Sequence, residues 1–127
     1  MSIKAMRETV ATQVNTIEYE TGKNLRVKAH PVKGNVRKGD GWVVVDTTTP
    51  GQFLGADELT LNVWVSLGSD ETYADAKIDD LIGPLLRAAE TLYGSNVSVQ
   101  QRQIVAGDGV PGAVYALVLV LTVEVSA

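Results

Sequence analysis

The sequence contains 127 residues, with 11 basic and 15 acidic side chains, one histidine and no cysteine. This length suits a single domain spanning residues 1–127, because compact domains most often contain about 100–150 residues. The lack of cysteine excludes a disulfide framework, thiolate metal sites and cysteine nucleophiles. One imidazole excludes a multi-histidine metal site. The composition therefore argues against most classes of enzyme.

The first ten residues carry Lys4, Arg7 and Glu8 and contain no continuous apolar stretch, so we expect no secretory signal peptide. The longest apolar stretch, residues 114–123, is much shorter than the ~20 residues of a membrane-spanning helix. We therefore expect synthesis in the cytoplasm and no membrane partner.

Residues 3–20 are predicted to form an amphipathic helix that ends at Gly22. Apolar side chains recur there at intervals of three and four residues: Ile3, Met6, Val10, Val14 and Ile17. A half-exposed strand over residues 25–30 follows, and Pro31 confines it to an edge of the sheet or marks its end. Residues 34–41 read as a glycine-rich basic loop.

Two strands, over residues 42–47 and 58–67, are predicted to flank a loop over residues 49–56. The second strand alternates regularly, which is typical of a sheet with one buried face. Trp64 lies on its polar face, where a large aromatic side chain requires cover. Either a helix of the same chain or a partner would supply that cover.

Residues 71–93 are predicted to form a second helix, which Ser69 or Asp70 caps. Acidic residues crowd its first half, where the helix dipole favours anions. Gly83-Pro84 interrupts the pattern, because proline removes a backbone donor. The apolar stripe stays in phase across this point, so we expect one kinked helix rather than two helices.

Strands over residues 97–103 and 114–126 complete the chain. The last strand is apolar on both faces in its first half, so Val118 and Val120 require cover in addition to the core. The elements predict an α+β fold with a mostly antiparallel sheet of about five strands. Two helices pack on one face, and the order is α-β-β-β-α-β-β.

Three patterns in the sequence resemble catalytic or ligand-binding sites, but each is better explained as an ordinary structural feature. Gly107, Gly109 and Gly112 match a dinucleotide fingerprint in spacing, but a strand follows them instead of a helix. Asp75 and Asp79 lie one helical turn apart and would suit a divalent ion, but the helix dipole and solvation in the first half of the helix explain them better. His30 has no recognisable serine and aspartate partners. We predict no catalytic residue, metal or cofactor.

The charges are unevenly distributed along the chain. Six basic residues follow one another without an intervening acid: Lys23, Arg26, Lys28, Lys33, Arg37 and Lys38. Such a run is usually a solvated surface, but it also suits contact with an acidic surface on a neighbouring copy or on nucleic acid. The net charge of −4 disfavours general nucleic-acid binding. Together with the apolar candidates Phe53, Leu54, Trp64, Val118 and Val120, the charge distribution favours self-association.

The arrangement of these elements resembles the tail terminator proteins of bacteriophages with long, non-contractile tails. The resemblance covers nearly the whole chain and rests on the order of elements. It includes the strand "ELTLNVWVSLGSD" leading into a helix, the helix "DAKIDDLIGPLLRAAETL" and the closing strand "VYALVLVLTVEV". It carries over no catalytic or binding motif residue by residue.

The resemblance implies a virion protein that forms a hexameric ring on the finished tail tube and stops its polymerisation. The ring would join the tube protein to the head connector, with DNA passing through its lumen. In such a ring, the segment 23–38, with Arg26, Lys28, Arg37 and Lys38, would contact the acidic helix around Asp75 and Asp79 of the next subunit. Placing the 34–41 loop in the lumen or on the tube-facing rim is a second arrangement.

Two alternative functions are compatible with the same sequence. The first is another neck or tail-completion protein. The second is a small oligomeric ligand-binding domain or enzyme with a subunit-interface pocket near Trp64 and His30.

Overall fold

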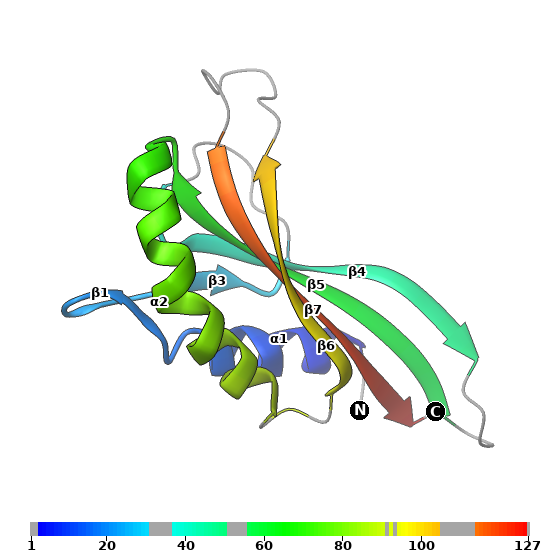
Figure 1. The fold of residues 1–127 in the computed structure, drawn as a ribbon. Coiled ribbons are helices and arrows are strands. Elements are labelled where there is room, and N and C mark those ends of the chain that lie inside the picture. The colour runs from blue at the N-terminus through cyan, green and yellow to red at the C-terminus, as the bar shows by residue number, and fades with distance from the viewer. Residues whose placement is uncertain are drawn as a thin grey trace.

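The computed structural model describes residues 3–30, 37–50, 56–90, 92, 94–104 and 114–126, and these form an α+β fold (Figure 1). A five-stranded sheet carries two helices, as the sequence predicts, and a separate two-stranded ribbon lies beside them. The Phe53–Leu54 pair, the three loop glycines and part of the basic loop lie outside the described residues.

The large sheet has the strand order β3-β4-β5-β7-β6. Its strands are β3 (Arg26–Lys28), β4 (Asp40–Pro50), β5 (Ala56–Gly68), β6 (Gly94–Ile104) and β7 (Val114–Ser126). All neighbouring pairs are antiparallel except β3 and β4, which run parallel. The prediction of a mostly antiparallel sheet is confirmed. Strands β4, β5 and β6 are longer than the alternating segments that predicted them, β7 has the predicted bounds, and β3 is shorter than the predicted strand over residues 25–30.

One face of this sheet forms the core. Odd-numbered residues of β5 and β7 point toward it, and most are fully buried: Leu59, Leu61, Val63, Val65, Leu67, Leu117, Leu119, Leu121 and Val123. Helices α1 (Ile3–Val14) and α2 (Glu71–Glu90) contribute Met6, Val10, Leu81 and Leu85 to the same cluster. Because this single cluster contains both helices and the odd-numbered residues, both helices pack on the same face.

The first helix ends earlier than the apolar spacing predicts, at Val14 instead of residue 20. The N–H of Asn15 still donates to the Ala11 carbonyl at 3.0 Å, and the chain departs from the helix after this residue, whose side chain binds the backbone of Val27 in β3. Its Nδ2 donates to the Val27 carbonyl at 2.9 Å, and its Oδ1 accepts from the Val27 N–H at 2.6 Å. This pair of bonds competes with helix continuation, as asparagine side chains commonly do.

Residues between α1 and β3 form a small antiparallel ribbon of β1 (Glu18–Glu20) and β2 (Lys23–Asn24). Gly22 lies in its turn with φ of 75°, a conformation that favours glycine. The prediction that Gly22 ends a helix is therefore wrong, and its conformational freedom serves a hairpin turn.

Helix α2 runs continuously through Gly83 and Pro84 as one element. The Asp70 side chain caps it, since Oδ1 accepts from the backbone N–H groups of Thr72 at 3.0 Å and Tyr73 at 3.3 Å. The single helix and its aspartate cap match the sequence prediction, and the apolar face lies on β5, β6 and β7.

Substitution of Gly41 tests the close packing between β3, β4 and β5. A Cβ atom at this position would lie 2.1 Å from the Trp64 carbonyl oxygen and 3.1 Å from Val27 Cγ2. We expect Gly41→Ala to lower the free energy of unfolding by on the order of 3 kcal/mol, measured by urea denaturation. Gly22→Ala is the matched control: no atom lies within 4 Å of its added Cβ. Its left-handed backbone should cost only about 1 kcal/mol, and equal losses in both variants would contradict the packing.

Candidate subunit interface

The second face of the sheet carries no helix in the described structure. The strand register places Lys28, Trp42, Trp64, Val118 and Gln100 in one row across all five strands on this face. The next row contains Val44, Asn62, Val120 and Ser98. We call the apolar residues of these rows, Trp42, Val44, Trp64, Val118 and Val120, the open-face patch.

Two tryptophans form the centre of the open-face patch. Trp42 and Trp64 are paired in register on β4 and β5, and their rings stack with centroids 6.2 Å apart and planes 13° apart. Both side chains are half-buried. A helix of the same chain does not cover Trp64, since both helices lie on the opposite face. The expectation that a helix of the same chain covers Trp64 is therefore wrong for the described helices, and the stacked Trp42 ring covers part of it instead.

The valines of the open-face patch confirm that β7 is apolar on both faces. Val118 is 3% exposed, although it lies outside the cluster that contains the helices, and Val44 and Val120 are half-buried. Between these two, the buried Oδ1 of Asn62 accepts no hydrogen bond within the described structure. The patch is therefore a partly exposed apolar band in which Val118 is already covered by its own chain, and it contains one unused acceptor.

The chemistry of this face changes along the strands. Lys28 lies at the end of the tryptophan row, and Thr60 and Thr122 pair beyond the valine row, with their Oγ1 atoms 3.3 Å apart. Glu58 and Glu124 are paired in register farther along.

The basic segment is largely tied to its own chain at Arg26 and Lys38. Arg26 forms an ion pair with Asp40 at 2.8 Å, and it also donates to the Tyr19 hydroxyl and the Lys38 carbonyl. The Tyr19 hydroxyl, as the largest cause, and the Asp40 carboxylate raise the pKa of Arg26. Lys38 Nζ lies 3.9 Å from the centre of the Tyr73 ring. Both side chains therefore hold the turn at residues 37–40 in place.

Lys28 and Arg37 differ from these two residues. Both are exposed, and neither forms an ion pair with a carboxylate in the described part of the chain. The Arg37 backbone N–H donates to Asp40 Oδ2 at 2.9 Å, which fixes the residue beside β3. Of the four basic interface candidates, these two are available to a partner.

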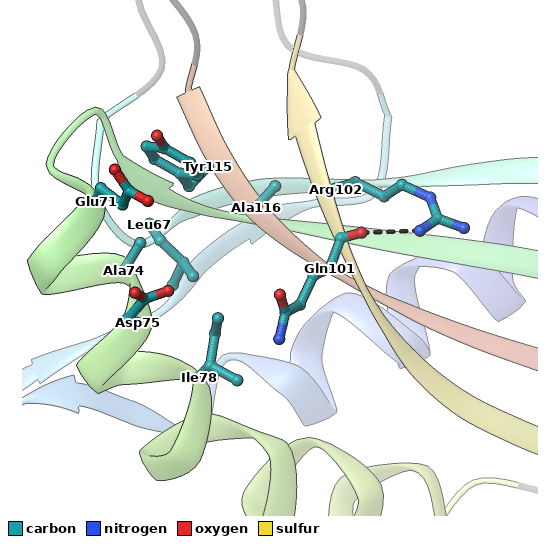
Figure 2. Close-up of a pocket in the computed structure, with 9 residues that line it drawn as sticks. All are labelled: Leu67, Glu71, Ala74, Asp75, Ile78, Gln101, Arg102, Tyr115 and Ala116. Atoms are coloured by element: carbon teal, nitrogen blue, oxygen red, sulfur yellow. Dashed lines mark hydrogen bonds between the residues drawn. The ribbon is translucent and has the colours of Figure 1, made fainter.

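The acidic candidates lie on a different side of the molecule. Asp75 and Asp79 are exposed on one flank of α2, in line with Glu71 at four-residue spacing. Glu71 and Asp75 border a cavity of about 480 Å³ between α2 and the strands β5, β6 and β7 (Figure 2). Leu67, Ala74, Ile78, Gln101, Arg102, Tyr115 and Ala116 also line this cavity.

Arg102 borders the cavity but forms no ion pair with the carboxylates of Glu71 and Asp75 in the described structure. Its guanidinium group donates to the Gln101 carbonyl at 2.8 Å and to the Gln100 side-chain oxygen, and Figure 2 shows it directed away from the cavity. Gln101 and Tyr115, in contrast, face α2 in the same view. The cavity therefore has walls of mixed polarity, and Glu71 and Asp75 lie on its α2 side.

The structure brings together some of the predicted site residues and separates others. Trp64, Val118 and Val120 share the open-face patch with Lys28 at its edge, whereas Asp75 and Asp79 lie on the outer flank of α2. Sequence reasoning missed Trp42 and Val44, although a register drawn for the β4–β5 hairpin would have paired Trp42 with Trp64. It also missed Tyr73, which no pattern in the sequence marks.

The described residues contain no group of three or more histidine or acidic side chains that would hold a metal ion. Among the same residues, no helix is long and apolar enough to cross a membrane. No protein-family model matches the chain, and no curated protein is significantly similar to it.

The contact between Tyr73 and Glu20 predicts a pH effect. The Tyr73 hydroxyl donates to Glu20 Oε1 at 2.8 Å, and this bond is the main cause that lowers the pKa of Glu20. A lowered pKa in the folded state stabilises the fold above the unfolded-state pKa, and this contribution disappears as the pH falls through the folded-state value.

We expect Tyr73→Phe to raise the pKa of Glu20 toward its ordinary value and to reduce the loss of stability on acidification. NMR titration of the Glu20 carboxyl carbon and urea denaturation at several acidic pH values measure the two effects. Tyr115→Phe is the control, since Tyr115 has no hydrogen bond to Glu20 in the described structure. An unchanged Glu20 titration in Tyr73→Phe would contradict the assignment.

Proposed function

We propose that this protein is a structural component of a bacteriophage virion, a tail terminator that assembles as a ring on the tail tube. The ring ends tube polymerisation and joins the tube to the head connector, and DNA passes through its lumen without sequence-specific binding. The resemblance of the element order to tail terminators supports the particular role. The geometry supports the more general role of an assembly protein.

The observation that carries the proposal is the open-face patch. Burial of apolar surface contributes about 25 cal/mol per Å², so an apolar band at the centre of a sheet face is a strong docking surface. Tryptophan is also enriched among the residues that dominate binding energy at interfaces. A stacked tryptophan pair flanked by valines therefore suits a subunit or tube contact more than a solvated surface.

The charges support assembly through two different surfaces of one chain. Lys28 and Arg37 lie at one edge of the sheet, and Glu71, Asp75 and Asp79 lie on the far flank of α2. A ring requires such unlike surfaces, because a head-to-tail interface joins two different patches of identical subunits.

The cavity beside α2 favours a second candidate function, a small oligomeric ligand-binding domain. Its volume of about 480 Å³ falls within the range of small-molecule sites. It lies on the helix-bearing side of the sheet, not beside Trp64 as the sequence reasoning placed such a pocket. A melting-temperature shift with small cationic metabolites would favour this function.

Replacement of Trp64 tests the role of the open-face patch. We expect Trp64→Thr to leave the circular dichroism spectrum of the monomer largely unchanged, because the core lies on the opposite face. Self-association or tube binding should weaken about 30-fold, which corresponds to a hot-spot loss of about 2 kcal/mol. Sedimentation velocity over a concentration series measures self-association.

Thr60→Ala is the matched control, since Thr60 lies on the same strand and the same face but outside the patch. Unchanged association in Trp64→Thr would show that the patch is not an interface.

The capping role has a direct test with tube protein from the same virus. We expect addition of the purified chain during tube polymerisation to stop elongation and to leave a ring at one tube end, seen by negative-stain electron microscopy. Tubes of unrestricted length without terminal rings would rule out the terminator role. A stable dimer or trimer in native mass spectrometry at every concentration would favour the ligand-binding function.

A further inference from the structure

The β3 edge of the sheet carries exposed basic side chains, and the flank of α2 that faces β6 carries exposed acidic ones. This arrangement specifies how copies fit together. We propose that the β3 edge of one copy docks against the flank of α2 and β6 of the next copy. This inference rests on the proposed ring. Lys28 and Arg37 of the first copy then face the acidic row of the second. We call these surfaces the basic edge (Lys28 and Arg37) and the acidic flank (Glu71, Asp75 and Asp79).

The topology directs these two surfaces toward different edges of the sheet. In the order β3-β4-β5-β7-β6, strands β3 and β6 are the two outer strands. The basic edge belongs to β3 and to the turn that Arg26 holds beside it. The acidic flank faces β6, because Glu71 and Asp75 line the same cavity as Gln101 of that strand (Figure 2).

The acidic flank is a receptive surface, not only a row of solvated charges. The cavity of about 480 Å³ opens between its carboxylates and β6. Ile78, Val97 and Val99 pack only partly against the core beside it, which leaves apolar surface for the aliphatic stem of a basic side chain. Lysine and arginine characteristically bury such a stem while the charged end reaches a carboxylate.

The acidic flank lacks a cation of its own in the described structure. The three described ion pairs involve Glu20, Asp40 and Asp80, and none involves the carboxylates of this flank. Arg102, the nearest described guanidinium that borders the cavity, is bonded to the oxygens of Gln100 and Gln101. A neighbouring copy supplies the missing positive charge from its basic edge.

The basic edge fits this role because its side chains are held in place by the fold but form no ion pair within the described part of the chain. Arg26 and Asp40 hold the turn at residues 37–40 against β3, and Lys28 is exposed on the strand itself. Asn15 occupies the N–H and carbonyl of Val27 from α1. The backbone of β3 at this residue is therefore satisfied, and the edge offers side chains to a partner instead of a further strand pairing.

Contact between opposite sides of identical chains propagates in one direction. Each copy then offers one unused basic edge and one unused acidic flank, so association continues until a ring closes. A two-fold dimer would require both contacts to form between the same two copies.

Charge reversal and mixing test this arrangement. The basic-edge variant is Lys28→Glu/Arg37→Glu, and the acidic-flank variant is Asp75→Lys/Asp79→Lys. Each variant alone has like charges on both surfaces, so the concentration for half-maximal assembly should rise at least tenfold in native mass spectrometry. An equimolar mixture should assemble again, because each altered surface meets a complementary one on the other variant. The mixed species should contain both variants in equal numbers and more than two chains.

Lys4→Glu/Arg87→Glu is the matched control, because it reverses two exposed charges outside both surfaces; it should assemble as the wild type does. Circular dichroism establishes that each variant is folded, and where assembly requires the tube, the same mixtures are scored for terminal rings on tubes.

The outcomes separate this inference from the proposed function. Assembly of either variant alone at wild-type concentration, or failure of the folded variants to assemble when mixed, would overturn the edge-to-flank contact while wild-type rings still supported the terminator. A mixture that stops at a heterodimer would overturn the head-to-tail arrangement. Absence of rings in the wild type, both alone and on tubes, would overturn the proposed function itself.

Discussion

The strict separation of the two faces of the sheet is the constraint on which the rest of the structure depends. Alternation in β5 and β7 directs one set of side chains into a core shared with both helices, and it directs Trp64, Val118 and their neighbours to the other face. A shift of one residue in register would exchange the two sets completely. The packing of the core therefore also fixes the open-face patch, including the pairing of Trp42 with Trp64.

The first helix does more than cover the sheet. Asn15 satisfies the N–H and carbonyl of Val27, and Arg7 donates to the Val43 carbonyl at 2.8 Å, just beyond the point where β3 ends. Exposed backbone groups at a sheet edge invite pairing with another strand, and proteins protect them in several ways. Side chains from α1 supply this protection at one edge, so contacts made there depend on charge and shape, not on backbone hydrogen bonds.

The sequence predicted the parts of the fold that depend on periodic burial: the five strands, the two helices on one face and the aspartate cap of α2. It failed where a single polar side chain overrides periodicity. Val14 and Ile17 continue an apolar helical spacing, yet Asn15 binds Val27 and ends the helix. The same holds for the candidate interface: strand alternation alone identified Trp64 and Val118 as its residues. Tyr73 and the internal ties of Arg26 depend on contacts between distant segments, which spacing does not encode.

Those internal ties change the meaning of the basic run at residues 23–38. In the sequence, this run is one continuous group of basic residues. In the fold, Arg26 contacts Asp40 and Tyr19, and Lys38 lies over the Tyr73 ring. Lys23 Nζ lies 3.5 Å from Glu20 Oε2. The acidic partners that the segment itself lacks come from elsewhere in the same chain. Among the described basic residues of this run, only Lys28 and Arg37 have side chains without such a contact and are available to a partner. Since exposed charges act over about 10 Å at ordinary salt, such a small pair selects the orientation of a partner more than it sets affinity. In the proposed ring, the apolar contacts beside them therefore supply most of the binding energy, and the charges select which surfaces meet.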